Sequence, residues 1–156
     1  MSKFSPMRKT CSAFFILPVI CLLVFTSAAP IKEDLPEDVF RQTNQFRRSK
    51  GLPALEMRND LNAIARRHSE DMASGRRRFG HSGLNEREMK VKRIIKPYYG
   101  IAENIAYGAR DGKEVVSVWK NSSIHRKNML GAYKYIGIGI ARDRRGDIYY
   151  TQIFVK

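Results

Sequence analysis

The apolar residues of this chain change their spacing near residue 135, and this change restricts the fold more than any other feature. Before it, apolar residues recur every three or four positions, as in the segment 61–72, which is typical of amphipathic helices. After it, residues 135–140 and 147–155 alternate, with Arg-Gly at 145–146 between them. That pattern predicts a β-hairpin. Helices followed by a hairpin predict an α+β domain.

Capping residues and glycines place the ends of the first helices. Pro36, followed by two acids, suits a helix start. Asn59 or Asp60 can cap a second helix, and Gly75 can end it. The elements expected here are helices over 36–50, 60–74 and 86–96, then a strand or an irregular segment over 100–108.

The last helix before the hairpin is expected to be continuous over 113–129. Its apolar spacing puts Val118 and Ser122 on an inner stripe. Gly137 and Gly139 lie inside the strand that follows. Glycines at such positions indicate the close approach of another backbone or side chain.

The N-terminus has the layout of a secretory signal peptide over 1–28. Basic residues precede a mostly apolar stretch, 13–25, and small residues follow it. We expect cleavage after Ala28, which leaves a lead-in over 29–36 and one domain over 37–156. A retained membrane anchor is the alternative, but the apolar stretch is short for a span, which needs ~20 residues.

Both cysteines, Cys11 and Cys21, lie inside the expected signal peptide. The remaining domain then has no thiol, so its fold must depend on a hydrophobic core without disulfides. This also excludes a cysteine nucleophile and any thiolate metal site.

The chain is strongly basic, with a formal net charge of +14. The expected signal peptide contains Lys3, Arg8 and Lys9 and no acid, so the remaining domain has a net charge of +11. Its basic clusters would attract nucleic acid, acidic glycans, wall polymers or anionic membranes. Because no base-stacking aromatics lie among the arginines, we expect no specific nucleic-acid binding, and a solubilising surface is the simpler interpretation.

Few residues in the chain belong to a recognisable catalytic or metal-binding pattern. The three histidines are His68, His81 and His125, and none forms the H-E-x-x-H pair of a helical zinc site. The chain also lacks a G-x-S-x-G elbow, a phosphate loop, a dinucleotide turn and an EF-hand loop. His68 lies on the apolar stripe of the second helix, which is typical of a hydrogen-bonded core residue.

Seven motifs give the chain a family resemblance. In order, it contains RQTNQFRRSKGLPAL, ARRHSEDMAS, FGH, AENIAYG, VVSVWKNSSIHRKNML, IGIGIA and YYTQIF. From about Val39 to Phe154 it resembles the CAP superfamily of cysteine-rich secretory, antigen 5 and pathogenesis-related 1 proteins. The absence of cysteines from this stretch resembles the disulfide-free branch common in bacteria. The resemblance implies a three-layer α-β-α sandwich with a central antiparallel sheet.

The resemblance also implies a central cleft lined by two histidines and two acidic residues. His81 matches the first histidine, Glu103 the acid of the Glu-Asn motif, and His125 the second histidine. The second acid of the family stands three residues after the helix tryptophan, where this chain has Ser122. Two other acids are candidates to replace it in space, namely Glu86 and Glu88.

Three functions are compatible with these residues. His81, Glu103 and His125 could hold Zn²⁺ or another divalent cation with water at an open position. Ser122, His125 and Glu103 are the residue types of a nucleophile, a base and an orienting acid, so a hydrolase, including a metal-dependent one, is the alternative function. The family resemblance implies a non-enzymatic extracellular binding domain, which we favour because the second acid is missing.

The binding interpretation requires no cofactor and implies a secreted monomer, either extracellular or in the cell envelope. The resemblance makes lipids and sterols candidate ligands, and the charge adds an anionic wall polymer or a membrane surface. Arg126 and Asn128 are expected to support the site by bonding helix-terminal carbonyls and neighbouring loops.

Overall fold

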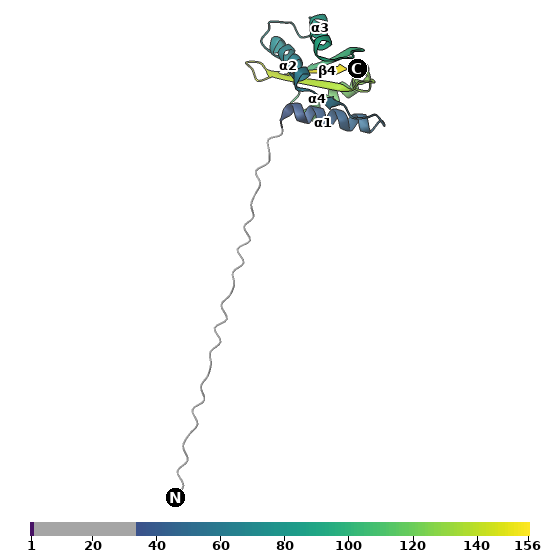
Figure 1. The fold of residues 1–156 in the computed structure, drawn as a ribbon. Helices are drawn as coiled ribbons and strands as arrows, with labels where there is room; N and C mark the ends of the chain where they lie inside the picture. Colours follow the sequence, from purple (N-terminus) through teal and green to yellow (C-terminus); the bar gives the residue numbers. More distant parts are fainter. Residues whose placement is uncertain (2–33) are drawn as a thin grey trace. The chain divides into compact units, whose positions relative to one another are not determined.

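The structure is a computed structural model that describes Met1 and residues 34–156 (Figure 1). The expected signal peptide, apart from Met1, and most of the expected lead-in therefore lie outside the described residues. Within the described part, the chain forms five helices and four strands. In chain order they are α1 (Leu35–Arg48), β1 (Glu56–Met57), α2 (Asn59–Ala73), α3 (Leu84–Ile94), β2 (Ile101–Tyr107), α4 (Gly112–Asn121), α5 (Ser123–Met129), β3 (Tyr135–Arg142) and β4 (Ile148–Val155).

The four strands form one sheet in the order β1-β3-β4-β2. β3 and β4 are the antiparallel hairpin that the sequence predicts, and β2 pairs antiparallel with the other edge of β4. The short β1 runs parallel to β3, so the sheet is antiparallel except at this edge. Because β2 is regular, the strand alternative is the correct one for the segment 100–108.

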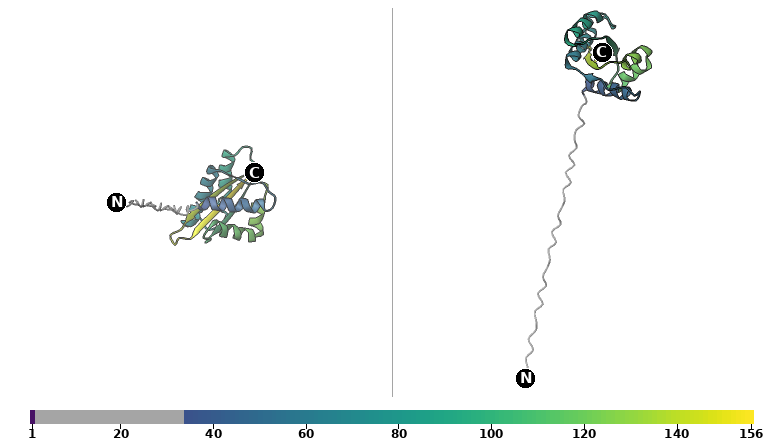
Figure 2. Two further views of the ribbon diagram at one scale, coloured as in Figure 1. Left: turned by 90° about the horizontal axis from the view of Figure 1, so that it is seen from below. Right: turned by 45° about the vertical axis from the view of Figure 1, so that its right-hand side comes forward.

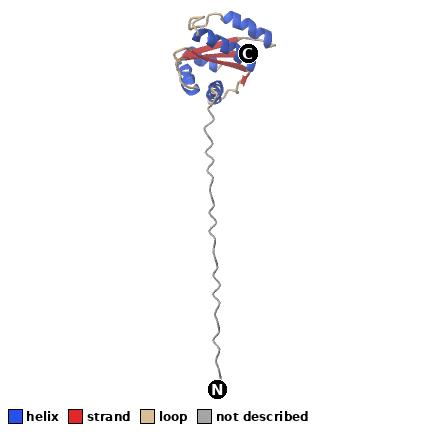
Figure 3. Cartoon of the chain, turned by 90° about the vertical axis from the view of Figure 1, so that its left-hand side faces the viewer, coloured by secondary structure: helices blue, strands red, loops and turns tan. Residues whose placement is uncertain are grey.

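The alternating side chains of β4 divide the core into two layers. Tyr150 and Phe154 belong to a core cluster with residues of α1, α4 and α5. Ile153 and Val155 belong to a second cluster with residues of α2 and α3. The strands lie between the two sets of helices (Figure 3), with α1 in front of the sheet in the left view of Figure 2. This is the three-layer α-β-α sandwich that the family resemblance implies.

Trp119 of α4 connects its helix to the strand that carries the site. The side chain is fully buried, and its indole N–H donates to the carbonyl of Ile105 in β2 at 3.0 Å. A buried indole usually finds such a partner, since its body is apolar and its N–H is a donor. The bond holds α4 against β2, two positions beyond Glu103.

The strand glycines allow α2 to lie directly on β3. A Cβ at Gly137 would come within 2.5 Å of Leu61, and one at Gly139 would collide with the backbone of Ala65. The hydroxyl of Ser69 uses this short separation to donate to the carbonyl of Gly139 at 2.9 Å. The predicted close approach of another backbone is therefore confirmed.

The expected continuous helix over 113–129 is wrong, because the chain breaks it at Ser122. That residue has extended backbone (φ −92°, ψ 124°) and separates α4 from α5. Its Oγ accepts a hydrogen bond from the backbone N–H of His125 at 3.5 Å and so caps α5. Serine favours a cap over a helix interior because its hydroxyl competes for nearby backbone groups. Val118, expected on the inner stripe, is 51% exposed.

The predicted cap of α2 is also wrong. Arg58 occupies the capping position and offers no side-chain bond there. Asp60 lies instead in the first turn, where its carboxylate accepts from the N–H of Leu61 at 2.8 Å and pairs with Arg58 at 2.6 Å. An acid in the first turn interacts favourably with the helix dipole. At the other end, α2 stops just before Gly75, which has a positive φ of 74° as its predicted role requires.

Candidate functional site

Glu103, in β2, lies at the centre of the candidate site. Its side chain is 1% exposed. Arg87 of α3 donates to both carboxylate oxygens, from Nε to Oε2 and from Nη2 to Oε1, each at 2.7 Å. His81, in the loop before α3, places its Nδ1 2.9 Å from Oε1. The paired carboxylate is thus held by a two-pronged guanidinium contact, which is the strong geometry for an arginine–carboxylate bond.

His68 of α2 completes this buried network. Its Nδ1 lies 3.1 Å from Nη1 of Arg87, and its Nε2 lies 3.0 Å from the carbonyl oxygen of Gly80. An imidazole with a proton on Nε2 donates to Gly80 and accepts from Arg87, so both contacts fit one neutral tautomer. Burial, followed by the charge of Arg87, lowers the pKa of His68. The residue has the structural, hydrogen-bonded role that its apolar stripe predicts.

His125 lies on α5, which is hydrogen-bonded to β2. Its Nδ1 is buried and makes no hydrogen bond within residues 34–156. Burial lowers the pKa of His125, and the positive charge that His81 can carry lowers it further. His125 is therefore neutral at pH 7, and the charge that acts on it is that of the other histidine of the expected pair.

Asparagines hold α5 beside Glu103. Asn104 donates from Nδ2 to the carbonyl of His125 at 3.1 Å. Asn128 donates to the carbonyl of Glu103 at 3.2 Å and to Oδ1 of Asn104 at 2.9 Å. Arg126 donates to the carbonyl of Lys120 at the end of α4 at 2.7 Å. Arg126 thus bonds a helix-terminal carbonyl as predicted, whereas Asn128 bonds strand β2 instead of a helix end or a loop.

The structure brings His81 and Glu103 into direct contact but does not build the nucleophile–base–acid chain. Glu103 bonds His81, whereas the buried Nδ1 of His125 has no carboxylate beside it within the described residues. Ser122 is used as a helix cap. The two acids considered as replacements are engaged elsewhere: Glu86 pairs with Arg77, and Glu88 with Lys92 and Tyr98.

Sequence reasoning missed Arg87, which neutralises Glu103. Arg87 and Val91 are four positions apart, and they are the two buried residues of α3. That spacing puts them on one helical face, so an arginine in register with a core valine is the signal that could have found it. The surrounding basic residues of α3 obscured this signal.

The metal hypothesis meets a specific obstacle in this arrangement. Within residues 34–156, no group of three or more histidine, cysteine, aspartate or glutamate side chains is arranged to hold a metal ion. A cation on Glu103 would have to compete with Arg87, which already donates to both oxygens. Imidazole nitrogens are good ligands for Zn²⁺, so an ion held by His81 and His125 stays a prediction.

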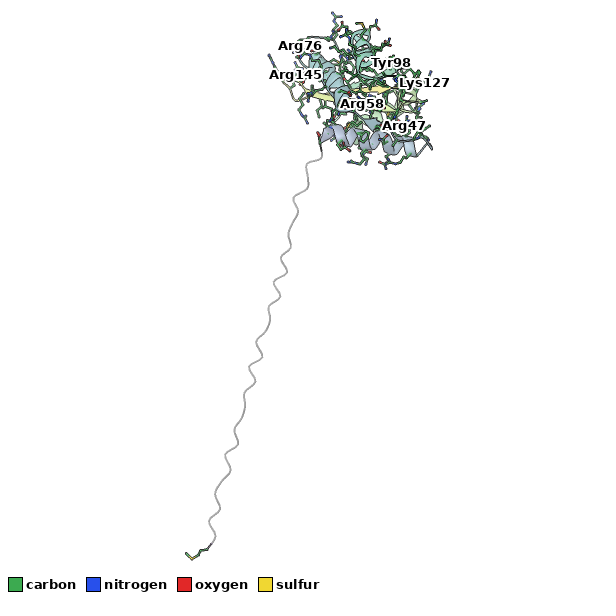
Figure 4. The ribbon with its side chains drawn as sticks, in the orientation of Figure 1. Arg47, Arg58, Arg76, Tyr98, Lys127 and Arg145 are labelled. Atoms are coloured by element: carbon green, nitrogen blue, oxygen red, sulfur yellow. The ribbon has the colours of Figure 1, made fainter. Side chains whose placement is uncertain are left out.

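A second feature, the arginine groove, lies where the end of α2 meets the turn between β3 and β4. Its volume is about 720 Å³. Arg144 and Arg145 line it, and their side chains make no ion pair or hydrogen bond within residues 34–156. Figure 4 shows Arg76 and Arg145 at the same end of the domain. The other charged lining residues are Glu70, Arg76, Arg142 and Asp143.

The sandwich fold and the histidine–glutamate site define a CAP-type domain. A model of the cysteine-rich secretory protein (CAP) family matches residues 40–154, and the chain belongs to that family. This confirms the family that the seven motifs indicate. Among the described helices, none is both long and apolar enough to cross a membrane.

Two proteins of Bacillus subtilis (strain 168) are similar in sequence. The "uncharacterized membrane protein YlbC" is 36% identical over 117 residues, covering 73% of this chain and 32% of that protein. The "uncharacterized protein YkwD" is 33% identical over 134 residues, covering 84% of this chain and 51% of that protein. The chain thus spans a third to a half of the length of these curated relatives.

Solved structures show the same fold. An extracellular protein with an SCP domain from Bacillus anthracis (strain Ames) is 28% identical, with a TM-score of 0.66 over 77% of this chain and 39% of that one. A cysteine-rich secretory protein from Staphylococcus aureus Mu50 is 28% identical, with a TM-score of 0.64, covering 81% of this chain and 40% of that one. An outer surface protein of Borrelia burgdorferi is 19% identical, with a TM-score of 0.64, covering 80% of this chain and 96% of that one.

Proposed function

We propose that the chain is an exported, non-enzymatic domain that binds an anionic polymer of the cell envelope. The observation that carries the proposal is the arginine groove. Arg144 and Arg145 line a concave surface, and their side chains have no acidic partner within residues 34–156. A carboxylate or phosphate group could pair with them without breaking an existing bond, and arginine suits both groups because its donors form a planar fork.

The shape of the groove favours a polymer over a membrane. An extended chain of anionic groups can lie along a concave surface and make several ionic contacts at once. A flat bilayer would reach only the rim of such a groove. The net charge of +11 that the domain keeps without the expected signal peptide adds a long-range attraction that speeds the encounter with any polyanion.

The non-enzymatic part of the proposal is supported by the state of Glu103. An acid that acts as a base needs a free lone pair directed at the proton it takes. Both oxygens of Glu103 already accept from Arg87, and one lies against His81. The hydroxyl of Ser122, three residues before His125, already caps helix α5. The network is therefore suited to fixing α3 and β2 rather than to chemistry.

Export is supported by two independent features. The N-terminal pattern of basic, apolar and small residues over 1–28 is that of a signal peptide. Solved relatives from B. anthracis and B. burgdorferi are described as an extracellular and an outer surface protein. The charge of the domain fits a partner found there, since envelope polymers are commonly anionic.

The test is binding of long-chain polyphosphate at low and high salt. The double variant Arg144→Glu, Arg145→Glu should weaken binding by about tenfold or more, and it should flatten the dependence of log K on log salt by about two units. The matched control is Lys113→Glu, Lys127→Glu, which changes the net charge equally at two exposed lysines outside the groove.

If both double variants weaken polyphosphate binding equally, binding depends on net charge and not on the arginine groove, and the proposal is overturned. So would tighter binding to anionic phospholipid vesicles than to the polymer. Labelling of the protein by a serine-reactive fluorophosphonate would contradict the non-enzymatic part.

A further inference from the structure

Three aromatic side chains, here called the aromatic cluster, pack together at one end of the sheet. Phe79 comes from the loop between α2 and α3, Tyr107 from the end of β2, and Tyr149 from the start of β4. The ring centroids of Phe79 and Tyr107 are 5.1 Å apart, and those of Tyr107 and Tyr149 are 5.8 Å apart. Both separations lie within the favourable range for aromatic pairs. The rings therefore hold one another in place before any ligand arrives.

The aromatic cluster faces solvent although its rings are largely apolar. Phe79 is 48% exposed and Tyr107 is 59% exposed, while Tyr149 is partly buried. None of the three belongs to either of the two core clusters. Packing of the core therefore does not account for these rings. An ordered group of exposed aromatic side chains is typical of a binding surface, because covering the rings removes apolar area from water.

The sheet places the aromatic cluster beside the arginine groove. Tyr149 pairs directly with Tyr107 of β2 on one side and with Ala141 of β3 on the other. Side chains of directly paired residues point to the same face of a sheet. Because Ala141 lines the arginine groove, the groove and the rings share one face. A ligand that lies across the three strands at this end would contact both.

The charges of the turn between β3 and β4 reach the aromatic cluster. Burial raises the pKa of Tyr149, and the charges of Asp143, Asp147 and Arg145 also act on this hydroxyl. The carboxylate of Asp143 accepts from the backbone N–H groups of Arg145 and Asp147, at 2.9 and 3.0 Å, so it is engaged inside the turn. The guanidinium of Arg145 makes no hydrogen bond within residues 34–156 and is available to an anion near the rings.

We propose that the anionic polymer is a glycan, whose sugar rings stack on the aromatic cluster while its acidic groups pair with the arginine groove. This inference rests on the proposed function and names the chemistry of its ligand. A pyranose ring has a face of C–H groups, which suits the negatively polarised face of an aromatic ring. Sugar hydroxyls surround that face, and the hydroxyl of Tyr149 can bond them. Within residues 34–156 this hydroxyl has no partner, and it is not sealed from solvent.

A polymer without rings would leave the aromatic cluster in water. Polyphosphate and acidic polypeptides can pair with Arg144 and Arg145, but they offer no flat apolar face to Phe79 and Tyr107. Single-stranded nucleic acid offers both phosphates and flat bases, so it is the competing ligand. Export of the domain favours the glycan, because sugar polymers are the main material of cell envelopes.

Binding of oligogalacturonate, compared with poly-L-glutamate of equal total charge, tests the inference. Both polymers carry a carboxylate on every unit, but only the first has sugar rings. By analogy with bases that stack on aromatic side chains, we expect oligogalacturonate to bind at least about tenfold more tightly. The preference should persist as salt is raised, because salt screens the ionic contacts of both polymers but not the stacking.

Substitutions at Tyr107 locate the site without disturbing the core. Tyr107→Ala should remove the preference for oligogalacturonate, whereas Tyr107→Phe keeps the ring and should retain most of it. Polyphosphate should bind Tyr107→Ala as tightly as the wild type, because it has no ring to stack, and this binding also shows that the variant is folded. The matched control is Tyr99→Ala. It removes a tyrosine that is 71% exposed just before the start of β2, at the opposite end of the strand, and it should behave like the wild type.

Three results would overturn the inference. They are equal affinity of the wild type for oligogalacturonate and polyglutamate, an unchanged preference in Tyr107→Ala, and tighter binding of single-stranded oligothymidylate than of oligogalacturonate. Each can occur while polyphosphate still binds through Arg144 and Arg145, so the inference can fail while the proposed function stands. Polyphosphate binding that does not depend on these arginines would overturn the proposed function itself.

Discussion

The buried pair of Arg87 and Glu103 leads to the sharpest prediction of stability. Their side chains are 7% and 1% exposed, and two bonds of 2.7 Å join them. The substitution Arg87→Met keeps much of the apolar stem but removes the guanidinium. It leaves a buried carboxylate with a hydrogen-bond contact to His81 at 2.9 Å and with Nε2 of His68 3.8 Å away. Removing one partner of a buried ion pair costs about 3–5 kcal/mol, because the other charge stays buried and uncompensated.

A double-mutant cycle separates the free energy of the Arg87–Glu103 interaction from general damage to the core. Glu103→Gln alone leaves Arg87 buried without its counter-charge, so it should also be destabilising. The double variant Arg87→Met, Glu103→Gln buries no net charge. It should therefore be more stable than the sum of the single effects predicts, with a coupling of about 2 kcal/mol or more.

Urea unfolding followed by circular dichroism at pH 7 provides the assay. The matched control is Arg77→Met, which breaks an exposed pair with Glu86 and should cost less than about 1 kcal/mol. A cost below about 1 kcal/mol for Arg87→Met, or additive effects in the double-mutant cycle, would refute the reasoning.

Four further predictions follow from the described contacts. Burial lowers the pKa of both His68 and His125. Because the unfolded chain then binds more protons, the free energy of unfolding should fall as the pH drops below about 6.5. A urea midpoint that stays constant between pH 7 and pH 5 would contradict this. Gly139→Ala should cost about 3 kcal/mol or more, because its Cβ would collide with the backbone of α2, and a melting temperature equal to the wild type would refute the tight contact. Ser122→Ala should cost about 1 kcal/mol in urea unfolding through loss of the cap of α5, and Ser122→Asp should restore most of it. If His81 and His125 hold a metal, chelator-treated protein should release heat on titration with Zn²⁺. The double variant His81→Ala, His125→Ala should release none. Identical isotherms from the two proteins would refute the metal hypothesis.

Local sequence patterns determined most of the secondary structure. The stripe of α2, the hairpin of β3 and β4, and the close approach at Gly137 and Gly139 all follow from spacing within a few residues. Such patterns are informative because residues four apart share a helix face and residues two apart share a strand face. The same reasoning failed at Ser122, where helix continuation and capping were both locally acceptable.

The site was predicted only in part, and through family resemblance rather than spacing. The pair of His81 and Glu103 is 22 positions apart, so no local period links the two residues. Arg87 was missed because the other basic residues of α3 obscured its register with Val91. Its role appears only when β2 places Glu103 beside the inner face of α3.

Arg47 shows what only the tertiary structure decided. In the sequence, the Arg-Arg pair at 47–48 is typical of a basic cluster on a solvated surface. In the fold, the first of these arginines loses its water and donates to carbonyls 82 and 84 positions further along the chain. The sequence by itself determined how many cations the domain carries and where its helices and strands form. Which cations stay solvated, and which are buried without a counter-charge, was decided by contacts between distant segments, because desolvation depends on what the whole chain packs around a group.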